Sequence, residues 1–183
     1  MRRGRAKIDV LISSRSRLLR GGARRRRHTS PAAPRPPSLT PTAPFGASAA
    51  ARRWHGTPYH DQASLRDVGC DCLGLARGVW REVVGSETLP VPPYSRDWGE
   101  IGSREVLADS AARVMIRIDP ETAGAGAAVL FRMRAGAVAK HLGIVSAAGD
   151  APRFIHAYTH HGVIDSPLTA PWRNRIAARF RFP

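Results

Sequence analysis

The stretch Gly69-Cys-Asp-Cys-Leu-Gly-Leu75 holds both cysteines of the 183-residue chain and runs directly into a helical pattern. Asp71 is one of the residue types that cap a helix N-terminus, and Gly85 follows where a terminating glycine is common. Between them, apolar residues recur at helical spacing at Cys72, Ala76, Val79, Trp80 and Val83. This pattern predicts a helix that starts just after Asp71, with the Cys72 side chain on its inward face.

Cys72 is therefore predicted in the first turn of a helix. Unsatisfied N–H groups and the helix dipole favour negative charge there, so we expect a lowered thiol pKa and a nucleophilic thiolate. Cys70 lies before the helix, where the dipole helps less, but it competes for the same role. A buried cysteine is also commonly an inert apolar residue, so spacing alone leaves the function of either thiol open.

Two cysteines are too few for a disulfide framework, and no second cysteine pair is present to complete a structural zinc site. We therefore expect no metal and no cofactor. The apolar run at residues 8–12 is too short to span a bilayer, and the N-terminus has no apolar segment typical of a secretory signal. We expect synthesis in the cytoplasm and no membrane insertion.

The positive charge of the chain, +15 in total, is concentrated at the N-terminus. Residues 1–53 carry 14 basic side chains and one acidic one, whereas residues 54–183 carry 15 and 13. A run of four arginines and a Pro/Ala/Ser/Thr tract favour disorder. We predict a disordered basic leader at residues 1–49 and one globular domain at 50–183. The leader's arginines are compatible with nucleic-acid binding, with a transit peptide, or with a true start of translation further downstream.

Ser103 is the expected cap of a second helix that carries apolar residues on one face between residues 106 and 114. Alternating or continuous apolar segments then predict strands at 129–133, 141–145, 153–158, 162–165 and 176–182. Helices followed by a run of short strands indicate an α+β domain with an antiparallel sheet of about five strands.

His141 and His156 fall on two of these strands. If the strands are adjacent and antiparallel, both imidazoles project from one face, and packing the end of the Cys72 helix on that face gives a Cys/His/His relay. Gly143 is expected to leave room for the helix terminus or for substrate. Tyr59 fits a hydrogen-bond donor to an oxyanion and fits a core residue equally well.

The remaining histidines carry no clear role in the sequence. His55 and His60 flank a Gly/Pro turn, and His160 and His161 fall in a predicted exposed turn. A surface or satisfied core position is the ordinary explanation for such residues.

Four blocks together resemble the NlpC family of cysteine peptidases in order and spacing, over the whole of residues 50–183. They are Trp54-His-Gly-Thr-Pro-Tyr59, Asp71–Leu75, Lys140–Ile144 and Phe154–Ala157. Gly69–Leu75, the Tyr94–Trp98 segment and the closing Trp172–Pro183 resemble the branch of cell-wall peptidases found in phage tails and gene transfer agents.

This resemblance implies a papain-like fold that hydrolyses peptide bonds in peptidoglycan stems, typically the D-γ-glutamyl–diamino-acid bond. It implies Cys72 as nucleophile, His141 as base and His156 as the residue that orients His141. Tyr59 and Asp71 fall at its oxyanion or substrate-binding positions. The implied partners are peptidoglycan stem peptides and phage-like tail proteins, which places the expected site of action at the bacterial cell wall.

Two positions depart from the family pattern: Leu73 stands where Ser is common, and Gly126-Ala127 where many members have Gly-Asp. Neither departure removes a catalytic group. Two alternatives stay open, namely a weakly active tail-tip structural protein of the same fold and a thiol amidase or acyltransferase with another substrate.

Overall fold

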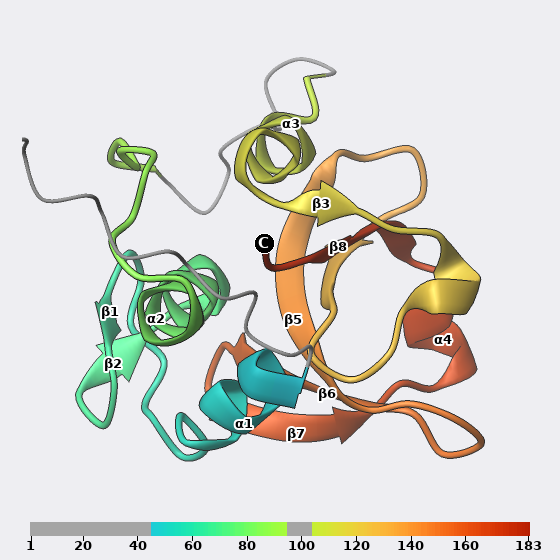
Figure 1. The fold of residues 1–183 in the computed structure, drawn as a ribbon, viewed down its shortest axis with the longest axis horizontal. Helices are drawn as coiled ribbons and strands as arrows, with labels where there is room; N and C mark the ends of the chain where they lie inside the picture. The colour runs from blue at the N-terminus through green and yellow to red at the C-terminus, as the bar shows by residue number, and fades with distance from the viewer. Residues whose placement is uncertain (1–44, 95–103) are drawn as a thin grey trace, which may run out of the picture. The chain divides into compact units, whose positions relative to one another are not determined.

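A computed structural model of the chain describes residues 45–94 and 104–183 (Figure 1). The helices in these ranges are α1 Phe45–Arg52, α2 Cys72–Val83, α3 Val106–Val114, the short α4 Ala170–Arg173 and the 3-10 turn η1 Pro120–Thr122. The strands are β1 Ser64–Leu65, β2 Gly69–Cys70, β3 Ile116–Arg117, β4 Ala128–Arg132, β5 Ala139–Ala147, β6 Arg153–Tyr158, β7 Gly162–Pro167 and β8 Ile176–Arg181. The predicted α+β class with helices on an antiparallel sheet is confirmed.

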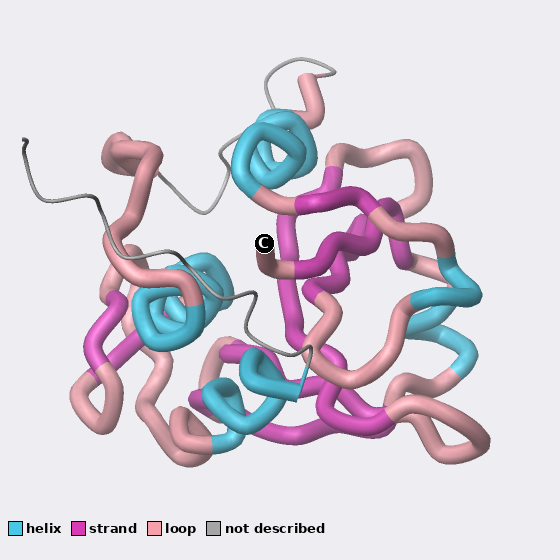
Figure 2. Tube along the Cα trace, viewed as in Figure 1, coloured by secondary structure: helices cyan, strands magenta, loops and turns pink. Residues whose placement is uncertain are grey.

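The main sheet has six strands in the order β3-β8-β4-β5-β6-β7, and all neighbours are antiparallel. The sequence predicted five of them, and the two-residue β3 is the addition at one edge. Strands β1 and β2 form a separate hairpin just before α2. Figure 2 shows the strands in magenta, with helices α1 and α2 lying beside β5 and β6.

The predicted start and end of α2 are confirmed. The Asp71 carboxylate accepts the N–H of Gly74 at 2.7 Å, and Gly85 takes a left-handed φ of +116° after the helix. Helix α3 has Glu105 at its N-cap position, and the predicted cap Ser103 lies outside the described residues. Helix α1 begins at Phe45, so it crosses the boundary expected between residues 49 and 50.

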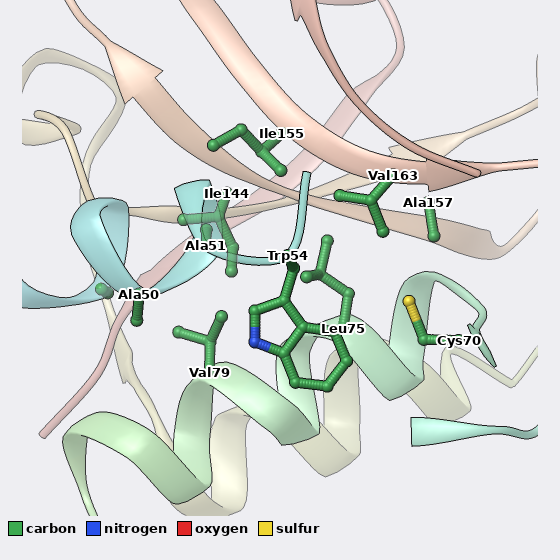
Figure 3. Packing of buried hydrophobic residues seen from close by; sticks show 11 residues of the cluster. Ala50, Ala51, Trp54, Cys70, Leu75, Val79, Ile144, Ile155, Ala157 and Val163 are labelled. Carbon is green, nitrogen blue, oxygen red and sulfur yellow. The ribbon is translucent and has the colours of Figure 1, made fainter. Parts of the chain in front are cut away.

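One face of the sheet packs on α1 and α2. Ile144, Ile155 and Ala157 from the sheet meet Leu75 and Val79 from α2 in a fully buried cluster (Figure 3). At the centre of this cluster the Trp54 ring lies against Gly78, where a Cβ would come within 1.9 Å of the ring. The absence of a side chain at residue 78 therefore lets the tryptophan ring lie against the α2 backbone.

The opposite face of the sheet is covered by a second apolar cluster. Phe131 from β4 and Phe154 from β6 pack against Trp172 of α4, with ring centroids 5.1 Å apart in both cases. Successive residues of a strand point to opposite faces. The residues that alternate with Leu142 and Ile144 on β5 therefore face this aromatic cluster instead of α2.

Candidate active site

The Asp71 side chain fixes the segment that carries Cys72. Besides capping α2, its second carboxylate oxygen accepts the backbone N–H of Gln62 at 2.9 Å and the hydroxyl of Tyr94 at 2.5 Å. Asp71 is 4% exposed. Three donors on one buried carboxylate hold the first turn of α2 in a single position, with Cys72 as its first residue.

The sulfur of Cys72 lies where strands β5 and β6 separate. The registered pairs of these strands run from Ala147↔Arg153 to Ile144↔Ile155 and stop before His141 is reached. Beyond that point, the Cys72 sulfur lies 4.0 Å from the backbone carbonyl of Lys140, the residue before His141. The first turn of α2 thus reaches the β5 backbone at a break in the sheet.

His141 and His156 are neighbours, as predicted. Nε2 of His141 lies 2.8 Å from Nδ1 of His156, and both residues are buried. Nε2 of His156 in turn lies 3.1 Å from the hydroxyl of Ser166 on β7. Because Nε2 of His141 is occupied by His156, Nδ1 is the nitrogen of the His141 ring that remains for proton transfer.

Sequence reasoning missed Ser166. It stands two positions from Ile164, the β7 residue that pairs with His156, and therefore lies on the same face of the sheet as this histidine. The β6–β7 register brings the two side chains together. A Ser-Pro pair at a strand end gives no sign of that register in the sequence.

The body of α2 does not pack on the histidine face, where the sequence led us to expect only the Cys72 end of the helix. Leu142 and Ile144 face the helices, whereas His141 and His156 face the aromatic cluster, with ring centroids 5.7 and 5.3 Å from that of Trp172. The body of α2 and the imidazoles lie on opposite sides of the sheet. Only the first turn of α2 approaches β5 near His141 through the break described above.

The expectation that Gly143 leaves room for substrate is wrong. A Cβ at residue 143 would come within 2.5 Å of the Phe154 ring. That ring stacks on His156 with centroids 4.3 Å apart. Gly143 therefore makes space for the aromatic residue that supports His156.

The sequence led us to expect a lowered pKa for the Cys72 thiol, and the structure gives a raised one. Burial, with the Asp71 carboxylate as the next cause, raises the pKa of Cys72 to about 12, and the backbone N–H of Leu142 opposes this only in part. Burial lowers the pKa of His141 to about 3, and the neighbouring His156 lowers it further. Desolvation thus outweighs the helix dipole, so the thiol and the imidazole are both neutral at pH 7.

The pKa of His156 is lowered to about 4, again mainly by burial and then by the charge of His161. The carboxylate of Asp165 acts in the opposite direction. His156 is therefore neutral at pH 7 and has one N–H to donate. A neutral pair of histidines avoids placing two like charges 2.8 Å apart in a buried site.

Two tyrosines lie in the electrostatic environment of Cys72. The hydroxyl of Tyr59 donates to the Asp61 carboxylate at 2.9 Å, and burial raises its pKa to about 12, with Cys72 among the smaller causes. Burial also raises the pKa of Tyr94, whose hydroxyl is bound to Asp71. Both phenols keep their protons at pH 7 and remain hydrogen-bond donors. Tyr94 was noted in the sequence only as part of a resembling segment.

Cys70 belongs to the core. It is 0% exposed and packs among Leu75, Ala157 and Val163 (Figure 3). Burial raises its thiol pKa to about 12. Unlike the partly exposed Cys72, this sulfur is out of reach of a substrate.

No group of three or more His, Cys, Asp or Glu side chains within 45–94 and 104–183 is arranged to hold a metal ion. In the same ranges, no helix is long and apolar enough to cross a bilayer. His55 and His60 are exposed, as are His160 and His161 in the β6–β7 turn.

Known structures with a similar fold come from NlpC/P60 proteins. A lipoprotein-like NLP/P60 family protein from Staphylococcus aureus matches with a TM-score of 0.51 and 21% identity, over 76% of this chain and 41% of that one. An NlpC/P60 family protein from Bacillus cereus matches with a TM-score of 0.54 and 19% identity, over 79% of this chain and 41% of that one. NlpC1 from Trichomonas vaginalis matches with a TM-score of 0.51 and 17% identity, over 76% of this chain and 44% of that one.

The chain thus spans about two fifths of the length of the structures it matches. At these identities the likeness shows a shared fold, that of NlpC/P60 proteins. No protein-family profile matches the sequence, and no curated protein is similar to it.

Proposed function

We propose that this NlpC/P60-like domain is a cysteine peptidase that cleaves peptide bonds in peptidoglycan stems. Cys72 is its nucleophile, His141 its base and His156 the residue that orients the base. The observation that carries this proposal is the buried contact between His141 and His156 at the break in the sheet that the Cys72 sulfur reaches. The shared fold with NlpC/P60 proteins supports it.

The reaction starts from a neutral thiol and a neutral imidazole, as their pKa values require. The thiol proton moves to Nδ1 of His141 while the sulfur attacks the scissile carbonyl carbon, which gives a tetrahedral oxyanion. Nδ1–H then protonates the departing amine, and a thioester remains on Cys72. A water molecule, deprotonated by the same nitrogen, hydrolyses the thioester and restores the thiol.

The oxyanion needs hydrogen-bond donors near the sulfur. The backbone N–H groups of Cys72 and Leu73 are such donors, because they precede the Gly74 N–H that binds Asp71 and have no partner within the helix. Tyr59 is the second donor in this proposal. The hydroxyl group retains its proton at pH 7, and its interaction with Asp61 must be exchanged for the oxyanion during the reaction.

The finer assignment rests on the resembling sequence blocks. They favour the D-γ-glutamyl–diamino-acid bond as the target and a phage-like tail as the carrier. In this proposal the tail brings the peptidase to the cell wall, where local cleavage opens a path through the envelope. The basic leader is not needed for the chemistry.

Digestion of purified bacterial cell walls with the full chain, followed by mass spectrometry of the released peptides, tests the function and identifies the bond. The expected result is cleavage that disappears in Cys72→Ala and is largely kept in Cys70→Ala, the matched control. Loss of activity in Cys70→Ala alone would overturn the assignment. A folded wild-type chain that releases no peptide would favour a structural tail protein, and cleavage of other amides would favour a different thiol amidase.

A further inference from the structure

One indole ring lies over the face of the sheet that carries the two active-site histidines. The ring centroid of Trp172, on α4 (Figure 1), lies 5.7 Å from that of His141 and 5.3 Å from that of His156. The same ring lies 5.1 Å from both Phe131 and Phe154. Trp172 thus contacts both imidazoles and the rings on which they pack, yet no step of the proposed mechanism uses it.

Trp172 is the outermost ring of this group. Phe131 and Phe154 are both 0% exposed, and His141 and His156 are 7% and 1% exposed. Trp172 is partly exposed, and α4 has no fully buried residue. The indole therefore lies between the four inner rings and solvent.

The segment that carries Trp172 is fixed to the sheet at both ends. Before α4, the N–H of Leu168 donates to the carbonyl of Pro152 at 2.7 Å, and the Leu168 side chain is buried in the aromatic cluster. After α4, the carbonyl of Arg175 accepts the N–H of Arg132, at the end of β4, at 2.8 Å. The N–H of Arg175 donates to the Trp172 carbonyl at 3.0 Å. These bonds hold the backbone of the tryptophan in place above the histidines.

Ionisable groups from other elements surround the histidine pair. They are Cys72 at the start of α2, Tyr158 on β6, His161 in the β6–β7 turn and Asp165 on β7. The charge of His161 lowers the pKa of His156 and that of Asp165 raises it, whereas an indole carries no charge. On α4 itself, the Arg173 guanidinium donates to the Leu168 carbonyl at 3.3 Å. Trp172 can therefore act on the histidines only by excluding water, and a substitution there leaves every one of these groups in the chain.

Water beside the histidine pair would weaken the proposed chemistry in two ways. The 2.8 Å bond between His141 and His156 directs the base, and water competes for the same two nitrogens. Water also stabilises the imidazolium form, because burial is the first cause that lowers the pKa of both histidines. A protonated His141 cannot accept the thiol proton.

We infer that Trp172 is a positioning residue, whose indole keeps water from the bond between His141 and His156 and thereby holds the His141 ring in place. The inference rests on the proposed peptidase function, because it explains how the base of that reaction is kept ready. It assigns a role to α4, which contains no group that takes part in the mechanism. A role in packing alone predicts instead that loss of the ring lowers stability and activity to the same extent at every pH.

Titration of the imidazoles by NMR tests the inference on the full chain without reference to activity. Isotope-labelled histidine gives the signals, and His141→Gln and His156→Gln identify those of the pair. In the wild type both imidazoles should stay neutral from pH 8 to pH 5. In Trp172→Ala at least one of them should gain a proton with a midpoint near the ordinary value of about 6.5.

Two further variants accompany Trp172→Ala. Trp172→Phe keeps a smaller ring and should move the midpoint in the same direction by less, and it takes the place of Trp172→Ala if that variant does not fold. Trp80→Phe is the matched control, because this buried indole on α2 packs on Phe182 and donates to the Ser86 carbonyl at 3.2 Å. It should lower stability without moving either midpoint. Thermal unfolding shows whether each variant is folded.

The pH dependence of kcat/KM on soluble peptides from bacterial cell walls is the second readout. The wild-type value should change little between pH 8 and pH 5.5, because the thiol and both imidazoles stay neutral. Trp172→Ala should lose about tenfold more activity at pH 5.5 than at pH 8, since a base with a pKa of about 6.5 is mostly protonated at pH 5.5. A loss of equal size at both pH values would overturn the inference.

The two readouts separate this inference from the proposed function. If the wild type cleaves no cell-wall peptide but a histidine of the folded Trp172 variant titrates near pH 6.5, the exclusion of water by Trp172 stands and the peptidase assignment fails. If the wild type cleaves these peptides but both histidines of the variant stay neutral to pH 5, the peptidase stands and the role of Trp172 fails. If nothing is cleaved and both histidines of the variant stay neutral, both fail.

Discussion

Nε2 of His141 lies 2.8 Å from Nδ1 of His156, and this contact determines the tautomers of both rings if His141 is the base. Nδ1 of His141 must hold a lone pair to accept the thiol proton, so its Nε2 carries hydrogen and donates to His156. His156 then carries its own hydrogen on Nε2 and donates to the Ser166 hydroxyl at 3.1 Å. Ser166 is thus a positioning residue, which acts on the base through His156.

Ser166→Ala should lower kcat about five- to tenfold, the effect of losing one hydrogen bond to the tautomer that the reaction needs. KM should stay close to the wild-type value, because Ser166 contacts His156 and has no contact with the substrate in the proposed mechanism. Steady-state kinetics measure both constants. Ser146→Ala is the matched control, since it loses a bond to Asp165 on the same strand β7. Equal effects of the two variants on kcat would rule out a role of Ser166 in positioning.

Gly143→Ala should lower the free energy of unfolding by about 1–3 kcal/mol, because the new methyl group overlaps the Phe154 ring. Movement of that ring also disturbs His156, so activity should fall as well. Urea unfolding and peptide hydrolysis measure the two effects. Gly124→Ala has open space around the new Cβ and should change neither. A Gly143→Ala protein as stable as the wild type would contradict the packing of Phe154.

Stability should decrease as the pH falls from 7 to 5. The folded-state pKa values of His141 and His156 are about 3 and 4, below the ordinary value of 6.5, so the unfolded chain binds protons first. The stabilisation by these neutral histidines is fully present above about pH 6.5 and is lost towards the folded-state values. Each contributes a slope of up to about 1.4 kcal/mol per pH unit.

Urea unfolding at several pH values above 5, where most carboxyl groups remain ionised, measures this slope. In His141→Gln, the slope of unfolding free energy against pH should decrease by the contribution of one histidine. His55→Gln should keep the wild-type slope. An unchanged slope in His141→Gln would show that His141 is not buried in its neutral form.

Alkylation of Cys72 by iodoacetamide should be slow at pH 7 and should rise through pH 9 without reaching a plateau, because burial and Asp71 keep the thiol protonated. The Cys70→Ala protein removes the second thiol from the measurement. A plateau below pH 6 would instead indicate a preformed thiolate–imidazolium pair, and the reaction would then start from that ion pair.

Asp71→Ala should destabilise the fold by about 2–4 kcal/mol, because three buried donors lose their acceptor and α2 loses its cap. Thermal or urea unfolding measures the loss. Asp71→Asn keeps one oxygen for the Gly74 N–H and should be less damaging. If both variants unfold like the wild type, Asp71 does not hold the first turn of α2 as described.

Local patterns in the sequence predicted α2 and most strands well. Asp71 and Gly85 are residues with fixed roles at helix ends, and alternation of apolar residues placed β4 to β8 to within a few residues. The pairing of His141 with His156 also followed from alternation, since both residues lie on one face of adjacent strands. These features depend on short-range geometry, which a single sequence records.

The remaining features of the site depend on tertiary packing. The pKa of Cys72 reflects its burial, whereas position in a helix alone suggested the opposite direction. The Phe154 ring packs against Gly143, and His156 forms a hydrogen bond with Ser166. Both contacts depend on which strands lie side by side and in which register. A pattern within one segment contains no information about such neighbours.

The β5–β6 register, which brings His141 next to His156, also bears on how this sequence can change during evolution. A single-residue insertion or deletion in the turn at residues 148–152 that shifts the register would turn one of the two histidines towards α2 and away from its partner. Substitutions in that exposed turn cost little, but changes of its length are expected to be selected against. The length of this exposed turn is thus constrained by the contact between two histidines that lie several residues away.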